Sequence, residues 1–193
     1  MRPTVRTEGA GYSAPTWTTG YTLAQVPRLP RWTDPADQGS RFDMVQAMVE
    51  LATAEGPIHV EVIHQRIREA WDIGRVSYRV RDNIDAAIQM ADVIREGDFI
   101  DLPNRPIDAV RTPANGVARR VDQVHVGELR VAVTFLSRDA GSTARDDLIT
   151  AVSRIFGWNR TSSDIGRRIS DLLDHMIASG DLYERDGLIH PPT

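Results

Sequence analysis

The segments GRVSYRVRDN, residues 74–83, and NRTSSDIGRR, residues 159–168, share one construction although they lie in different halves of the chain. Each has an Arg in a short turn, a Ser two positions later, and then an apolar residue every three or four positions. This spacing predicts a helix that begins just after the Ser. Because Arg75 and Arg160 stand 85 residues apart, we interpret the two segments as equivalent parts of a duplicated unit.

Apolar and turn positions elsewhere in the chain fit the same offset. It pairs identical residues without a gap: Ala47 with Ala132, Leu51 with Leu136, Gly56 with Gly141, Ser77 with Ser162 and Ile84 with Ile169. Conservative pairs follow the same frame: Ile63 with Leu148, Ile67 with Val152, Trp71 with Phe156 and Val80 with Ile165. The frame ends near the close of the third predicted helix, where the second copy carries a few extra residues. Two copies of one fold explain these matches better than chance periodicity.

Each copy is predicted to contain three helices and short β segments. In the first copy, the pattern predicts a helix from Arg41 to a stop at Gly56-Pro57, a short β run over 58–60, helices through 62–71 and 80–91, and a hairpin over 92–101. Asp186-Gly187 predicts the second hairpin. A strand after the first helix and a hairpin after the third are typical of a winged helix. The predicted fold class is mainly α with small β-hairpins (α+β), arranged as tandem winged-helix (helix-turn-helix) repeats.

These patterns divide the chain into four parts. Residues 1–40 are interpreted as an extended N-terminal arm, because they are rich in Pro, Gly and Thr and lack a helical period. Winged-helix repeat 1 spans 41–103, a linker spans 104–124 with one candidate strand at Asp108–Arg111, and winged-helix repeat 2 spans 125–193. The arm carries side chains that could dock on a neighbouring surface: Trp17, Tyr21, Leu23, Val26 and Leu29.

Composition excludes several classes of function. The net charge of −4 means that the whole molecule does not attract a polyanion, so any nucleic-acid contact must come from a local basic patch. All 23 basic residues are Arg, which fits either bidentate phosphate contacts or a coding bias; their spread along the chain favours the bias. The absence of Cys excludes disulfides and thiolate metal sites. With no secretory signal or apolar span, we expect a soluble, cytoplasmic protein without membrane contact.

One stretch carries a family resemblance. The segment 55–88 contains EGPIH at Glu55–His59, then Arg66-Ile67, then Arg75, Ser77 and Val80. With these residues it resembles a domain of unknown function found at the C-terminus of large bacterial Upf1-like superfamily 1 helicases that carry a restriction-endonuclease-like domain. The resemblance implies an accessory part of a helicase or nuclease system. A phosphate-binding GxxxxGK[ST] loop is absent from this sequence, so the ATPase of such a system would lie elsewhere, whether this chain is encoded separately or belongs to a larger protein.

The candidate nucleic-acid-binding residues surround the two turns. They are Arg75, Ser77, Tyr78, Arg79, Arg81, Asn83 and Arg95 in the first copy, and Arg160, Ser162, Arg167 and Arg168 in the second. The two Ser residues are candidate N-caps whose helix ends could also face phosphate. The turn Arg residues could contact phosphate or instead tie the turn to carbonyls of the second helix. Tyr78, Arg79 and Arg81 occur in the first copy alone, where we expect the more specific function, with Asn83 able to read base edges.

We predict no catalytic residue, no metal site and no cofactor. His59 and His64 are separated by five positions, which does not place both on one helical face, so His59 is expected in the strand and His64 on the helix. No turn motif presents a Ser nucleophile to a His. A small-molecule substrate is therefore not expected.

Two functions remain open on the sequence. The first is a non-catalytic nucleic-acid-binding accessory module that positions DNA for a helicase or nuclease partner. The second is a protein-interaction or structural module that docks on a large ATPase, because acidic residues are frequent on the predicted helices. These acids include Asp82, Asp85, Asp92, Asp146, Asp147, Asp171 and Asp174.

Overall fold

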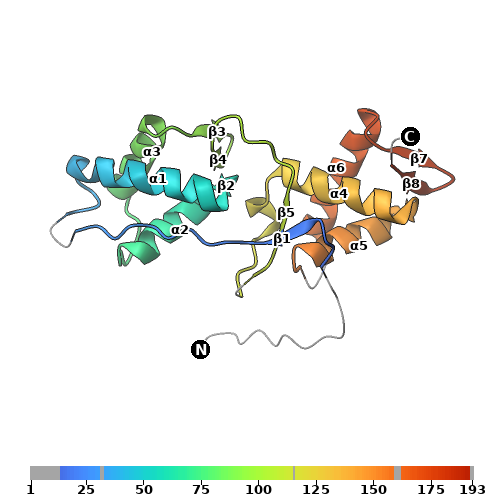
Figure 1. The fold of residues 1–193 in the computed structure, drawn as a ribbon, viewed down its shortest axis with the longest axis horizontal. Coiled ribbons are helices and arrows are strands. Elements are labelled where there is room, and N and C mark those ends of the chain that lie inside the picture. Colours follow the sequence, from blue (N-terminus) through green and yellow to red (C-terminus); the bar gives the residue numbers. More distant parts are fainter. Residues whose placement is uncertain (1–13, 31–32, 115, 159–161, 192–193) are drawn as a thin grey trace. The chain divides into compact units, whose positions relative to one another are not determined.

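The structure is a computed structural model that describes residues 14–30, 33–114, 116–158 and 162–191. It is an α+β fold, with six α-helices and small sheets among the described residues (Figure 1). The chain forms two compact units. The first unit contains the described residues within 22–106 and 123–125, and the second unit contains those within 14–21, 107–122 and 126–191. No described helix is long and apolar enough to cross a bilayer.

The first unit consists of three helices and one antiparallel sheet. After a 3-10 helix at Gln38–Ser40, its elements are α1 (Arg41–Glu55), β2 (Ile58–His59), α2 (Val60–Ala70), α3 (Tyr78–Met90), β3 (Ile94–Glu96) and β4 (Phe99–Asp101). The sheet order is β2-β4-β3, so β4 lies between the strand that follows α1 and the strand that follows α3. The core is formed by apolar faces of the three helices with Ile58 and Ile100.

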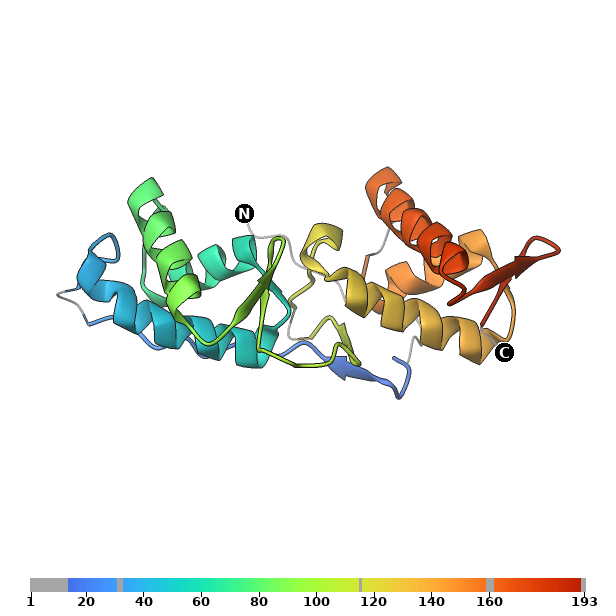
Figure 2. The ribbon, with the colours of Figure 1, turned by 90° about the horizontal axis from the view of Figure 1, so that it is seen from above.

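The second unit repeats this order of elements. It contains α4 (Val126–Ala140), β6 (Thr143–Ala144), α5 (Arg145–Ile155), α6 (Ser163–Ala178), β7 (Tyr183–Arg185) and β8 (Leu188–His190). Its sheet order, β6-β8-β7, matches that of the first unit. In both units the third helix leads into the hairpin (Figure 2). A short 3-10 helix at Val121–Gln123 precedes α4.

The spacing of the elements follows the frame found in the sequence. The helices α4, α5 and α6 and the strand β6 each begin 85 residues after their counterparts α1, α2, α3 and β2. The helix α6 is longer than α3, with 16 residues against 13, so the second hairpin starts later in its copy. The extra residues predicted near the end of the third helix therefore mainly lengthen α6 itself.

Local chemistry explains where the helices begin. The Ser77 hydroxyl accepts a hydrogen bond from the Val80 amide at 3.4 Å, and Ser162 accepts one from the Ile165 amide at 3.4 Å. The predicted N-caps are therefore present at the start of α3 and α6. The helix α2 begins differently, because the Nδ1 atom of His59 accepts a hydrogen bond from the Glu61 amide at 3.1 Å.

The segment before α1 is divided between the two units. Residues up to Tyr21 belong to the second unit, where β1 (Thr18–Gly20) pairs in parallel with β5 (Val110–Thr112). There the Trp17 ring stacks on Phe135 with their centroids 5.0 Å apart. Residues from Thr22 onward belong to the first unit. The strand that was expected in the linker at Asp108–Arg111 is β5, which begins two residues later and ends one residue later.

The EGPIH motif forms the junction between α1 and α2. The Glu55 side chain is fully buried and accepts hydrogen bonds from Arg66 at 2.9 and 3.0 Å and from the Ala24 amide at 3.0 Å. Ile58 enters the core and His59 caps α2. The residues of the EGPIH motif thus have an architectural role here.

Gly56 lies where backbone and side chains approach closely, which leads to a testable expectation. An added Cβ would overlap two groups, the Arg105 guanidinium and the Ala52 carbonyl oxygen. These two groups are themselves joined by a hydrogen bond of 2.7 Å, which the guanidinium donates. Gly56→Ala should therefore lower the free energy of unfolding by about 1–3 kcal/mol through overpacking. Chemical denaturation measures the loss. Gly39→Ala is the control, because no atom lies within 4 Å of its added Cβ; equal effects of the two changes would contradict the steric explanation.

Candidate functional site

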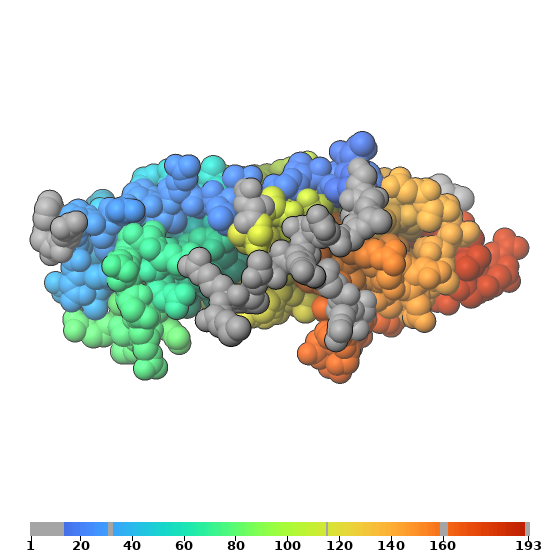
Figure 3. All heavy atoms as spheres, turned by 90° about the horizontal axis from the view of Figure 1, so that it is seen from below, coloured from blue at the N-terminus to red at the C-terminus, as the bar shows by residue number. Residues whose placement is uncertain are grey.

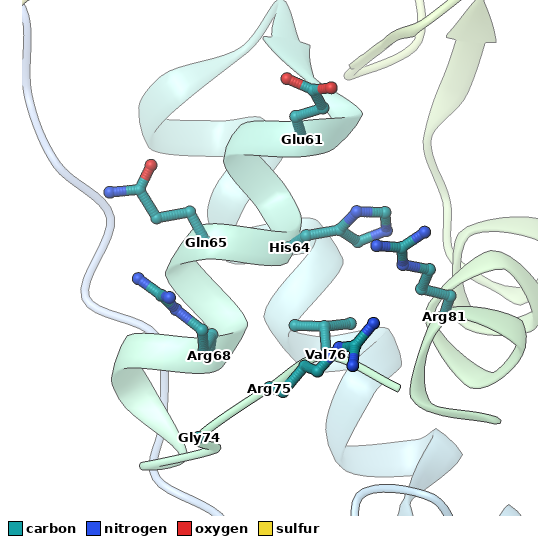
Figure 4. A pocket seen from close by; sticks show the side chains of 8 residues that line it. All are labelled: Glu61, His64, Gln65, Arg68, Gly74, Arg75, Val76 and Arg81. Atoms are coloured by element: carbon teal, nitrogen blue, oxygen red, sulfur yellow. The ribbon is translucent and has the colours of Figure 1, made fainter. Parts of the chain in front are cut away.

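An open pocket of about 420 Å³ lies in the first unit at the turn between α2 and α3 (Figure 4). Its lining comes from α2, from the turn and from the first turns of α3. The residues that define it are Glu61, His64, Gln65, Arg68, Gly74, Arg75, Val76 and Arg81. We call this group the turn pocket. The surrounding segment, residues 75–90, is at the surface of the first unit in the space-filling view (Figure 3).

The helical period explains why these side chains meet. Val62, Ile63 and Ile67 bury the inner face of α2, so the positions between them face outward. The helix ends at Ala70, and the turn is closed by a hydrogen bond from the Ile73 amide to the Arg68 carbonyl at 2.9 Å. The helix α3 then buries Val80, which leaves the next residue, Arg81, exposed toward the pocket.

The turn pocket has an excess of positive charge. Arg68, Arg75 and Arg81 are exposed, and none of them makes an ion pair with any residue that the structure describes. One carboxylate, that of Glu61, lies in the lining with these three guanidinium groups. The pocket therefore carries two more positive than negative charges.

Three other arginines of the first unit are engaged with acids. Arg66 binds Glu55, Arg105 binds Asp101, and Arg95 lies 3.3 Å from a carboxylate oxygen of Asp85. Guanidinium groups without such partners bind phosphate or carboxylate groups through paired, charge-assisted hydrogen bonds. The turn pocket is therefore the part of this unit that is best suited to an anion.

His64 has an unusual environment at the side of the pocket. Its Nε2 atom is buried and has no hydrogen-bond partner among the described residues. In Figure 4 the imidazole points toward the guanidinium of Arg81, and Arg75 rises from the turn below them. Burial, followed by the charge of Arg81, lowers the pKa of His64, although Asp85 and Glu61 oppose this shift. The imidazole is therefore neutral near pH 7 and has an unused polar atom.

The structure brings some of the predicted site residues together. Arg75 and Arg81 line the turn pocket, and Ser77 caps the helix beside it. Arg79 is exposed on α3 but does not belong to the lining. Tyr78 is 76% exposed, and a hydrogen bond with Asp82 raises the pKa of its hydroxyl. The turn and its cap thus place two arginines and an aromatic side chain at one exposed region.

Asn83 and Arg95 are placed differently from the prediction. Asn83 is 3% exposed; its amide nitrogen donates to the carbonyls of Pro35 and Asp37 at 3.0 and 2.7 Å, and its oxygen accepts from Arg41 at 3.0 Å. It joins α3 to the segment before α1, because it lies on the inner face of the helix. Asn83 is therefore not part of the exposed surface. Arg95 does lie at the surface, but its guanidinium is paired with the carboxylate of Asp85.

The candidate residues of the second unit form no comparable cluster within the described part of the chain. Ser162 caps α6, and Arg167 lies 3.8 Å from Asp164. Arg168 is half-buried; burial lowers its pKa, and the charge of Asp122 opposes this shift. Arg160 lies outside the described residues.

The repeat frame provides an internal comparison for the turn pocket. The counterparts of His64, Arg68 and Arg81 are, in order, Ile149, Ser153 and Gly166. The second unit forms the same helices without these side chains. The charged residues of the turn pocket are therefore not required by the architecture.

Sequence reasoning missed Arg68 and considered His64 only as a metal ligand. A signal was present, because Glu61, His64, Gln65 and Arg68 have the spacing of one helical face. The exposed side of α3 carries Asp82 and Asp85 beside Arg81, so the cations without acid partners gather around the turn between α2 and α3.

The geometry suits binding of an anion more than a metal ion. Among the described residues, no group of three or more His, Asp or Glu side chains is arranged to hold a metal. The guanidinium groups of the turn pocket offer donors, and Gln65 and His64 add neutral polar atoms.

Comparison with known proteins gives a match to a protein family. Neither a curated protein nor a solved structure matches the chain. Residues 34–82 match the family described as "Protein of unknown function (DUF3320)". The match covers α1, α2, the turn and the start of α3, and so includes every residue of the turn pocket.

Proposed function

We propose that this chain is a non-catalytic nucleic-acid-binding accessory module, built from two winged helices, that works with a helicase or nuclease. In this proposal the first unit binds the phosphate backbone of DNA through the turn pocket. The second unit has a mainly structural role.

The order of elements supports the winged-helix part of the proposal. In each unit a short strand follows the first helix, two helices joined by a turn come next, and a hairpin closes a sheet with that short strand. In a winged helix, α2 and α3 would form the helix-turn-helix and β3–β4 the wing. The turn between two such helices approaches the sugar-phosphate backbone in known complexes of this class.

The observation that carries the binding proposal is the set of three arginines in the turn pocket. Arg68, Arg75 and Arg81 come from three successive segments and yet line one open depression, without ion-pair partners in the described parts of the chain. Because the molecule carries a net charge of −4, such a local excess of cations stands out from its surroundings. Binding that rests on a few phosphate contacts should be weak and strongly dependent on salt.

A binding experiment with labelled duplex DNA tests this proposal. The native protein should bind at low salt, and its dissociation constant should rise steeply as salt is added. The triple variant R68A/R75A/R81A should bind at least about tenfold more weakly, and the slope of log K against log salt should fall by about 0.9 for each phosphate that the variant no longer neutralises. Fluorescence anisotropy over a series of salt concentrations measures both quantities.

The matched control removes the same charge elsewhere. R138A/R154A/R185A replaces three exposed arginines of the second unit and should retain the affinity of the native protein. Equal losses of affinity in the two triple variants would show that net charge, and not the turn pocket, governs binding.

Carboxylates near the turn pocket favour an alternative partner. Asp82, Asp85 and Glu61 lie beside the arginines, which suits a protein surface with charges of both signs. Failure of the native protein to bind DNA at low salt, together with stable co-purification with a large ATPase, would replace the nucleic-acid proposal with that of a protein-interaction module.

A further inference from the structure

Resting on the proposed function, we propose that the turn pocket binds a terminal phosphate group, the phosphomonoester dianion at the end of a nucleic-acid strand, with His64 as an additional ligand. According to this proposal, the pocket recognises the phosphorylated end of a strand and also contacts backbone phosphates. Four features of the pocket support it.

The first feature is the charge of the lining. Three guanidinium groups and one carboxylate give an excess of two positive charges, with His64 neutral. A phosphodiester in a strand carries one negative charge, whereas a terminal phosphate carries close to two near pH 7. The terminal group therefore balances the charge of the pocket more closely.

The second feature is the arrangement of the lining. The helix α2 supplies one side, the turn supplies the floor, and Arg81 of α3 stands opposite α2 (Figure 4). A phosphate inside a strand is linked to sugars through two of its oxygens and must let the chain leave in two directions. A terminal phosphate is linked through one oxygen and presents three others to surrounding donors.

The third feature is the unpaired Nε2 atom of His64. A buried polar atom without a partner is costly, and a ligand that supplies one removes that cost. In the tautomer that carries hydrogen on Nε2, the imidazole can donate to a phosphate oxygen. Charged groups from three elements act on the His64 imidazole: Glu61 on α2, Arg81 and Asp85 on α3, and Arg95 on β3. A bound dianion would offset the charge of Arg81 and so raise the pKa of His64.

The fourth feature is the contrast with the second unit. There the counterparts of His64 and Arg81 are Ile149 and Gly166, within an otherwise similar pair of helices. A scaffold role would not explain why one copy has a half-buried imidazole and an opposing guanidinium where the other copy has an apolar side chain and no side chain at all.

The test compares two DNA duplexes of identical sequence, in which one strand carries either a 5′-phosphate (the phosphorylated strand) or a 5′-hydroxyl (the hydroxyl strand). The native protein should bind the phosphorylated strand about tenfold or more tightly, as expected when charge-assisted hydrogen bonds are added. His64→Ala and Arg81→Ala should each reduce this ratio toward one. Arg79→Ala is the control, because it removes an exposed charge from the same helix outside the pocket, and it should leave the ratio unchanged.

A second readout separates ligation from a structural role. In NMR titrations of the full chain, the pKa of His64 should rise more when the phosphorylated strand binds than when the hydroxyl strand binds, because the terminal phosphate carries the larger negative charge. His64→Gln, which keeps a side-chain donor, should retain part of the preference. Circular dichroism spectra matching that of the native protein would establish that the variants are folded.

The outcomes distinguish this proposal from the proposed function. Equal binding of both strands, abolished in R68A/R75A/R81A, would overturn the end-reading proposal and leave the backbone-binding function standing. Binding of neither strand, with inorganic phosphate still shifting the His64 resonances, would support a phosphate site that takes a free anion and would overturn the nucleic-acid function. Absence of any response to phosphate or to either strand would overturn both.

Discussion

Replacement of Glu128 by Ala is expected to lower the free energy of unfolding of the second unit by about 3–5 kcal/mol. The Glu128 side chain is fully buried in α4. Its two oxygens accept hydrogen bonds from the guanidinium groups of Arg111 and Arg119, and one also accepts from the Arg111 amide, with distances of 2.7 Å. Without the carboxylate, two buried cations and an amide would lose this acceptor.

The same carboxylate joins separate segments of the second unit. Arg119 also donates to the Arg111 carbonyl at 2.7 Å, and its guanidinium lies 4.6 Å from the centre of the Tyr21 ring. The segment 107–122 and the end of β1 thus meet at Glu128. Its removal should therefore expose amides of β1 and β5 to solvent, which hydrogen exchange resolved by segment can measure.

A pH dependence accompanies this ion-pair network. Burial alone would raise the pKa of Glu128, but the hydrogen bond and charge of Arg119, with those of Arg111, outweigh it and lower the pKa. A carboxyl whose folded-state pKa is depressed stabilises the fold above its unfolded pKa of about 4.3, and this contribution is lost as pH falls toward the folded value. The native protein should lose stability in that acidic window, and E128A should lack this component.

The control for E128A is Asp171→Ala, which removes an exposed carboxylate on α6 and should change stability by less than about 0.5 kcal/mol. Denaturant unfolding monitored by circular dichroism compares the variants. A decrease below about 1 kcal/mol for E128A would show that the buried network adds little beyond an exposed pair.

The second large effect is expected from Glu55→Ala in the first unit, again about 3–5 kcal/mol. Glu55 is fully buried; its removal leaves the Arg66 guanidinium, with a side chain only 11% exposed, and the Ala24 amide without their acceptor. The destabilisation should be greatest around the start of α2 and the segment that follows Thr22. Hydrogen exchange at those amides is the direct measurement.

Glu50→Ala provides the matched control, because Glu50 is exposed on the same helix and accepts a side-chain hydrogen bond from Gln46. It should cost less than about 1 kcal/mol. If E55A were no more damaging than E50A, the buried ion pair at the EGPIH junction would not be the anchor that its geometry indicates.

The repeat frame predicted the order and spacing of the elements because both depend on local periodicity. The helix starts at Ser77 and Ser162 follow from capping chemistry, and the second hairpin turn follows from Asp186-Gly187, whose φ values are 55° and 75°. These features need few distant contacts. The sequence predicted the strands β1 and β5 less well, because a three-residue strand depends on its pairing partner more than on its own residues.

The buried acids show where local reasoning ends. In the repeat frame, the counterpart of Glu55 is Ala140, and the counterpart of Glu128 is the exposed Asp43. The frame therefore does not predict the buried ion pairs of Glu55 or of Glu128. Asn83 could be placed on a helix by pattern, but its burial depends on the carbonyls of Pro35 and Asp37, nearly fifty residues earlier.

The sequence alone therefore determined the duplicated element order, the start of the third helix in each copy, and the presence of Arg75 and Arg81 at the first of these turns. Periodicity, capping and turn chemistry act over a few residues, so they can be read directly from the order of amino acids. The tertiary structure decided that Arg68 and His64 share a pocket with those arginines, that Arg95 is paired, and that Asn83 is buried. These outcomes depend on which helix faces meet and which charges find partners, and both are set by packing between segments distant in the chain.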